Sequence, residues 1–163
     1  MKTNPGFDLI PASPEHVPAI MELITALAEF ERLTHLLEVT PEALHDHLFG
    51  QRRAAEVVVA LVAGEVVGFA LFFSNFSTFL GRPGLYLEDL FVRPERRGLG
   101  IGKALLEHLA ALALARGCGR FEWSVLDWNA DAIGFYESMG ATVMPEWRIC
   151  RVAGPALAAL ARS

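Results

Sequence analysis

One stretch of the chain decides the fold: Leu85-Tyr86-Leu87-Glu88-Asp89-Leu90-Phe91-Val92, followed by Arg96-Arg97-Gly98-Leu99-Gly100-Ile101-Gly102-Lys103. The first half is an apolar run typical of a buried strand, interrupted by two adjacent carboxylates. The second half is a glycine-rich turn that leads into a helix, because apolar residues recur at helical spacing over 101–112 and Gly117 follows. Residues 121–126 form the next strand-like run. The order strand, helix, strand predicts a parallel pair joined by a crossover helix.

The flanking sequence also alternates predicted strands and helices. A short strand over 7–11 precedes a helix opened by Ser13-Pro14-Glu15, and Pro18 implies that this helix begins irregularly. Thr40-Pro41-Glu42 opens a second helix. The other predicted elements are strands over 56–63 and 66–73 with a hairpin turn at Gly64-Glu65, a loop over 75–84, a helix capped by Asn129, and strands over 141–144 and 148–152.

Composition indicates one globular domain. Of 163 residues, 53% are hydrophobic and 20% charged, so we expect a single domain over 1–163 with one core. The net charge of −5 has the wrong sign for a general nucleic-acid binder and suits a cationic small molecule better. We find neither a membrane-length apolar run nor a leader pattern, and Cys118 and Cys150 lack zinc spacing. We therefore expect a cytoplasmic protein with no nucleic-acid, membrane or metal partner.

The glycine-rich turn has the chemistry of a phosphate cradle. Glycine lets the backbone approach a ligand closely, and the unpaired N–H groups and positive dipole end of the following helix favour an anion. A Walker loop would need Gly at Arg97 and Ser or Thr at Ala104, and the Rossmann fingerprint would need Gly at Lys103 or Leu105, so both are excluded. The alternative is a turn whose glycines serve only helix packing.

The remaining spacing, Arg-x-x-Gly-x-Gly at Arg97, Gly100 and Gly102, resembles the coenzyme A loop of the GNAT acetyltransferase superfamily. Accompanying blocks in the order of that family are Tyr86 to Val92, Asp127-Trp128-Asn129, Phe135-Tyr136 and Glu146-Trp147-Arg148. Together they resemble the diamine branch, the spermidine/spermine and thialysine N-acetyltransferases, over nearly the whole chain. The resemblance implies an α/β fold of the α+β type, with a mixed, mostly antiparallel sheet, a parallel central strand pair and helices on both faces.

The resemblance also implies that acetyl-CoA is the co-substrate. Its pyrophosphate would bind the N–H groups of the glycine loop, and its pantetheine arm would pair like an extra strand with the backbone of Leu90 to Val92, where the family's strands splay apart. The residues expected to bind it are Leu90, Phe91, Val92, Arg97, Gly98, Leu99, Gly100, Ile101, Gly102, Lys103, Asn129 and Ala132.

Two residues are expected to move protons. An amine with a pKa of about 10.4 is mostly protonated at neutral pH, so a group must accept a proton before attack. Glu88 is the candidate, acting through a water, whereas strand alternation would place Asp89 on the opposite face. The departing thiolate needs a proton donor, and the phenol of Tyr136 matches the family's catalytic tyrosine. The alternatives are a structural carboxylate pair and a core position for Tyr136.

An amine-binding set follows from the same resemblance. Glu31 and Glu122 offer negative charge, and Trp123 offers a cation–π surface for an ammonium group. Polyamine enzymes carry an aspartate in the loop over 75–84, where this chain has serine or threonine, which argues against long polyamines. The expected substrate-binding residues are Phe30, Glu31, Glu122, Trp123, Ser124 and Trp147.

These features predict an N-acetyltransferase that moves acetyl directly from acetyl-CoA to a primary amine of a small molecule, either a diamine, a polyamine or a thialysine-like or lysine-like compound. The alternatives are acetylation of a peptide or protein amine, a non-catalytic acyl-CoA sensor, and a structural interaction module. The resemblance also implies a homodimer, with which the apolar segment over 153–161 is consistent. The sequence leaves the physiological amine open.

Overall fold

The computed structural model describes residues 6–162, which divide into two compact units with the boundary between Ser124 and Val125. The first unit carries the sheet. Its elements are β1 (Asp8–Pro11), α1 (Val17–Phe30), α2 (Pro41–Phe49), β2 (Glu56–Val62), β3 (Glu65–Ser77), β4 (Arg82–Val92), α3 (Ile101–Ala115) and β5 (Arg120–Trp123). Short 3-10 turns cover Pro14–His16, Thr34–Leu36 and Pro94–Arg96.

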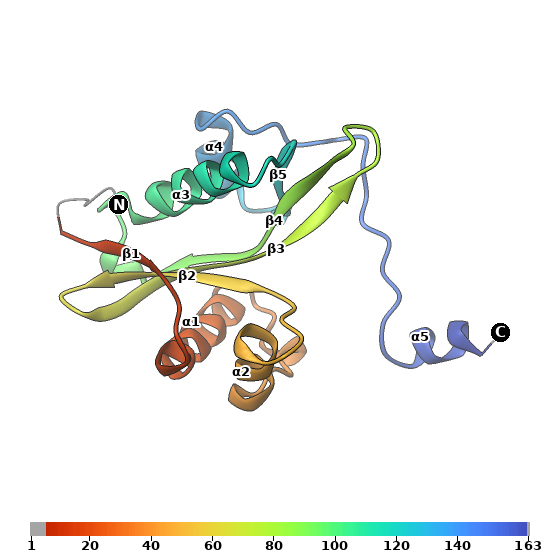
Figure 1. Cartoon of the computed structure of the whole chain (residues 1–163), viewed down its shortest axis with the longest axis horizontal. Coiled ribbons are helices and arrows are strands. Elements are labelled where there is room, and N and C mark those ends of the chain that lie inside the picture. The colour runs from red at the N-terminus through yellow and green to blue at the C-terminus, as the bar shows by residue number, and fades with distance from the viewer. Residues whose placement is uncertain (1–5, 163) are drawn as a thin grey trace. The chain divides into compact units, whose positions relative to one another are not determined.

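The five strands lie in the order β1-β2-β3-β4-β5. Only β4 and β5 are parallel, and the other neighbours are antiparallel, so the predicted mixed sheet with one parallel pair is confirmed. Helices α1 and α2 pack against one face, while α3, the crossover between β4 and β5, covers the other (Figure 1). No helix among residues 6–162 is both long and apolar enough to cross a bilayer.

Helix α1 begins irregularly, as Pro18 predicts. The 3-10 turn over Pro14–His16 precedes it, so Pro18 falls in the first turn of α1, where a missing N–H costs no helical hydrogen bond. Its inner face buries Ile20 and Leu23 against Phe69 of β3 and Phe91 of β4. Each such fully buried side chain contributes roughly 1.5–3 kcal/mol relative to exposure, which fixes α1 on the sheet.

Two of the predicted turns are wrong in their limits. The turn between β2 and β3 is Ala63-Gly64, with φ of 50° and 82°, so Glu65 already belongs to the strand. The predicted loop over 75–84 is mostly strand, because β3 continues to Ser77 and β4 begins at Arg82. Gly84 is needed there for close approach, since a Cβ atom at this position would lie within 2.3 Å of the Asn75 side-chain oxygen.

The second unit contains α4 (Ala130–Ser138) and α5 (Gly154–Ala161). The side-chain oxygen of Asn129 accepts a hydrogen bond from the Ala132 N–H at 3.2 Å, which confirms the predicted cap. The strands predicted over 141–144 and 148–152 are wrong, because these residues adopt no strand. Alternating apolar residues form a strand only beside a partner edge, and no described strand pairs with these segments.

An ion pair ties β2 to the end of α3. Two guanidinium nitrogens of Arg116 lie 2.6 and 2.8 Å from the two carboxylate oxygens of Glu56, and the guanidinium also lies over the Phe72 ring. The hydrogen bonds from Arg116 lower the pKa of Glu56 from its usual 4.5. A carboxyl group with a depressed pKa stabilises the fold above its unfolded pKa, and this stabilisation is lost as the pH falls through the folded pKa.

We predict that Arg116→Gln lowers the free energy of unfolding by about 0.5–1 kcal/mol at pH 7, a modest effect because the pair is partly exposed and screened. The difference from wild type should shrink as the pH falls below 4.5. Urea unfolding at pH 7 and in acid measures both effects. Glu107→Gln is the matched control, since its pair with Lys103 spans 3.7 Å between exposed groups and should contribute less. A pH-independent deficit in Arg116→Gln would contradict the assignment.

Candidate active site

The glycine loop leaves helix α3 with free donors at its start. Gly98 and Gly100 have φ of 82° and 79°, and Gly100 caps α3 from the left-handed region. The Ala104 N–H donates to the Gly100 carbonyl at 2.9 Å. Within residues 6–162, the three N–H groups before it, over 101–103, have no backbone acceptor. They add to the positive end of the helix dipole, so an anion is favoured here.

Gly102 has no structural reason to be glycine. Its φ is not positive, and a Cβ atom built on it would have no other atom within 4 Å, so neither backbone conformation nor packing excludes a side chain. A glycine that the fold does not require is expected where a ligand approaches the backbone closely. This open space beside the free N–H groups fits the diphosphate of a nucleotide.

Beyond Leu87, strand β4 has a free edge. β5 pairs with β4 only over Gly84–Leu87, so the edge facing β5 has no strand partner from Glu88 onward in the described part of the chain. The Arg93 N–H donates to the Val67 carbonyl of β3 at 2.8 Å, and the backbone groups of the preceding residue, Val92, therefore face the free edge. The Val92 carbonyl accepts a hydrogen bond from Arg97 Nε at 3.1 Å.

A β-bulge lies at Glu88. Phe72 of β3 pairs with Leu87 and Leu71 pairs with Asp89, which leaves Glu88 as an extra residue in β4. Strict alternation along the strand predicts that Asp89 lies on the opposite face from Glu88 and outside the site. The bulge interrupts that alternation. Because Leu71 packs against the core under α1 and α2, its partner Asp89 lies on the α1 side of the sheet.

The negative charges of Glu31 and Glu88 act on Asp89 at this point, and we call these three residues the acidic cluster. Burial raises the pKa of Asp89 from 3.8 to about 6, and the negative charges of Glu88 and Glu31 add to the shift. Glu31, at the end of α1, has its own pKa raised by burial. A partly buried acid that titrates near neutrality can bind an ammonium group and exchange a proton with it.

The other predicted amine-binding residues of this unit lie at the end of α1 and on or just after β5. Phe30 ends α1, half exposed, with Arg97 over its ring. The Glu122 carboxylate is paired with Arg120 Nε at 2.8 Å, so its charge is already compensated. The Ser124 hydroxyl is hydrogen-bonded to the Tyr86 hydroxyl at 2.8 Å, and the Trp123 ring lies 4.9 Å from that of Phe121. Of the two predicted acids, only Glu31 therefore belongs to the acidic cluster.

The second unit holds the remaining predicted residues. Tyr136 lies on α4, partly buried, with its ring 5.6 Å from that of Phe135. The side chain of Asn129 and the N–H of Ala132 are bonded to each other in the helix cap. Trp147 lies outside the helices and is 72% exposed.

Comparison with known proteins shows the family to which the chain belongs. The model of the acetyltransferase (GNAT) family matches residues 18–141, which include the glycine loop, the acidic cluster and Tyr136. The chain belongs to the GNAT acetyltransferases. It is an acetyl-CoA-dependent N-acetyltransferase, and the resemblance drawn from the sequence motifs is confirmed.

Characterised relatives of this GNAT acetyltransferase act on small amines. It is 38% identical to the L-ornithine N5-acetyltransferase of Arabidopsis thaliana, covering 91% of this chain and 85% of the relative. It is 39% identical to the thialysine N-epsilon-acetyltransferase of Mus musculus, covering 87% and 89% respectively. Among solved structures, an integron cassette protein from the mobile metagenome of V. cholerae superposes with a TM-score of 0.82 at 27% identity, covering 97% and 99%. These matches confirm the GNAT fold.

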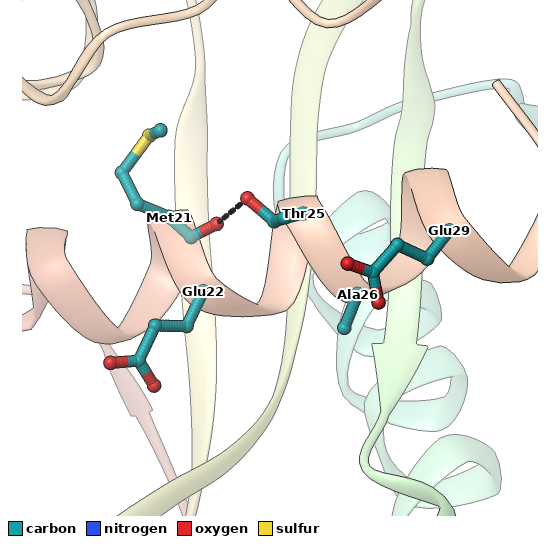
Figure 2. A pocket seen from close by; sticks show the side chains of 5 residues that line it. All are labelled: Met21, Glu22, Thr25, Ala26 and Glu29. Atoms are coloured by element: carbon teal, nitrogen blue, oxygen red, sulfur yellow. Dashed lines mark hydrogen bonds between the residues drawn. The ribbon is translucent and has the colours of Figure 1, made fainter. Parts of the chain in front are cut away.

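A shallow hollow of about 330 Å³ lies along α1, and none of its lining residues is one predicted for the site (Figure 2). All of its lining residues come from α1: Met21, Glu22, Thr25, Ala26 and Glu29. The Thr25 hydroxyl donates to the Met21 carbonyl at 2.9 Å, and Arg93 pairs with the Glu22 carboxylate at 3.0 Å. A groove along a single helix, with two of its polar side chains engaged in these contacts, is a surface feature.

Asp89 is the residue that sequence reasoning set aside. The one available signal was the pair of adjacent carboxylates inside an apolar strand, since one of the two must face a buried side. The bulge determines which of the two carboxylates faces the buried side. It depends on the register between β3 and β4, which no single residue in β4 predicts.

We predict that Asp89→Asn stabilises the protein at pH 7.5 by on the order of 2 kcal/mol. The raised pKa means that the folded state holds the proton more tightly than the unfolded state, so stability falls as the pH rises from 3.8 through about 6. The asparagine removes this loss, and its advantage should disappear below pH 3.8. Thermal unfolding across this pH range measures the effect. Asp8→Asn, at an exposed carboxyl on β1, should shift stability by less than about 0.5 kcal/mol, and an equal gain there would contradict the prediction.

Proposed function

We propose that this acetyltransferase acetylates a primary amine of a small molecule, a diamine or a diamino acid of the ornithine or thialysine kind. One observation carries the proposal: the acidic cluster, with Asp89 titrating near pH 6, lies at the bulge where the free edge of β4 begins. An anionic, partly buried site attracts an ammonium group and can also take up its proton. The names of the ornithine and thialysine relatives support the same substrate class.

The glycine loop and the free edge of β4 would hold the donor. The N–H groups over 101–103 suit the diphosphate, and the space at Gly102 admits it. Backbone groups over 90–92 suit the amide-bearing arm, which would lie along the strand toward Glu88. When bound, acetyl-CoA supplies a thioester whose acetyl group a free amine can attack.

Within this proposal the protein moves two protons. Glu88, exposed at the bulge, accepts the proton of the ammonium group through a water, while Asp89 and Glu31 hold the charged amine. Tyr136 donates a proton to the departing thiolate, because a phenol is protonated at neutral pH yet acidic enough to give up its proton. Transfer is direct, so no side chain carries the acetyl group.

The hairpin between β3 and β4 favours short amines over long polyamines. Ser77 is buried, and its hydroxyl accepts a hydrogen bond from the Leu80 N–H at 3.2 Å, so it serves the turn. Because Glu122 is paired to Arg120, we assign the ammonium group to the acidic cluster. We include in the proposal a single domain over 1–163 and a cytoplasmic location, as length and composition predict, and a homodimer, as the resemblance implies.

The test is an amine panel with purified protein and acetyl-CoA. L-Ornithine, thialysine and short diamines should be acetylated with higher kcat/KM than spermine or a lysine-containing peptide. Tyr136→Phe should lower kcat about 100-fold with unchanged coenzyme A affinity, because a proton donor contributes to chemistry and not to donor binding. A preference for the peptide would favour the protein-amine alternative, and coenzyme A binding without turnover would favour the sensor.

We further predict opposite outcomes for two glycines of the loop. Gly102→Ala should keep or raise stability, by up to about 1 kcal/mol from helix propensity, yet weaken coenzyme A binding roughly tenfold by filling the cradle. Gly100→Ala should lower stability by about 1–2 kcal/mol, because alanine is strained at positive φ. Urea unfolding and calorimetric titration with coenzyme A separate the two. Wild-type affinity in Gly102→Ala would show that the diphosphate lies elsewhere.

A further inference from the structure

Arg97 joins three parts of the first unit with one side chain. Its guanidinium carbon lies 5.4 Å from the ring centre of Phe30 and 5.5 Å from that of Phe91, and its Nε donates to the Val92 carbonyl at 3.1 Å. Arg97 itself precedes Gly98 at the start of the glycine loop. One residue therefore connects the loop, the end of β4 and the end of α1.

The two rings differ in burial. Phe91 is 5% exposed within the core shared by α1 and the sheet, so it is a fixed platform. Phe30 is 46% exposed at the last position of α1, so its cation–π contact with Arg97 is one of the interactions that hold the helix end. A change in how firmly Arg97 is held therefore acts on the end of α1, while Phe91 stays fixed in the core.

The end of α1 carries part of the amine site. Glu31 follows Phe30 directly and acts electrostatically on Asp89. The next residue, Arg32, has a φ of 59°, an uncommon conformation for a residue other than glycine, and the chain turns there. Hydrogen bonds from the N–H groups of Glu31 to the Leu27 carbonyl and of Leu33 to the Ala28 carbonyl close this turn, both at 2.8–2.9 Å.

We propose that Arg97 is a positioning residue that couples the two substrates: a donor bound at the glycine loop fixes Arg97, Arg97 holds Phe30, and Glu31 is thereby set for the amine. The inference rests on the proposed function. A loop with positive φ at Gly98 and Gly100 gains order when its N–H groups bind a diphosphate, and order passed to a neighbouring segment strengthens the next binding step. The coupling between donor and amine is expected to be roughly 5–10-fold, in the usual range for linked sites.

Amide hydrogen exchange with coenzyme A alone tests the coupling without an amine. In wild type, coenzyme A should slow exchange roughly 3–10-fold both over residues 98–106 and over residues 31–37. In Phe30→Leu, which removes the ring at a half-exposed position, protection over 98–106 should persist while protection over 31–37 is lost. Phe30→Tyr keeps the ring and should behave as wild type, as should Leu36→Ala, which removes an exposed side chain from the same segment.

The outcomes separate the coupling from the proposed function. Protection over 98–106 with none over 31–37 in wild type, or equal protection over 31–37 in Phe30→Leu, would overturn the coupling. Faster exchange over 31–37 would also overturn it, since it would mean that Arg97 leaves Phe30 for the phosphates. Absence of protection over 98–106 would instead overturn donor binding at the loop. At saturating acetyl-CoA, Phe30→Leu should raise the amine KM about fivefold, while the affinity for coenzyme A measured without an amine should change less than twofold.

Discussion

The extra residue in β4 is the constraint on which the site depends. A regular strand would carry Leu87, Asp89 and Phe91 on one face, yet Leu87 pairs with Phe72 while Asp89 and Phe91 face α1. The bulge at Glu88 makes this switch. It moves Asp89 and Phe91 to the α1 face of the sheet, opposite to Leu87, and it lies where β5 leaves β4. The same bulge therefore sets both the packing of Phe91 under α1 and the place of Asp89 in the acidic cluster.

Much of the architecture could be predicted because its signals are local. The glycine loop opening α3, the Thr40 and Asn129 caps, and the parallel order of β4 and β5 follow from residue types at fixed spacings. The errors arise where the pairing of strands distant in the sequence determines the structure. The long β3–β4 hairpin depends on Gly84 fitting against Asn75, and the bulge depends on the register between those strands. Residues 141–144 have a strand pattern without a partner edge in the described chain.

The site is built against stability. An acid kept largely out of water beside two other carboxyl groups favours the unfolded chain at neutral pH, and the glycine at position 102 lowers helix propensity with no packing reason. Both features suit ligand binding, because the buried acid attracts an ammonium group and the glycine leaves room for a diphosphate. The cores under α1 and under α3, rich in fully buried Leu, Ile and Phe, supply the stability that the site gives up.

The turn between β2 and β3 has a consequence for how such a protein can change. Ala63 adopts a φ of 50°, a conformation that asparagine or glycine tolerates better, and the strain there has no connection with either substrate. A single substitution of Ala63 by glycine or asparagine would therefore add stability without replacing any residue assigned to either substrate. A lineage that acquires a more acidic pocket for a new amine could offset the lost stability in this way.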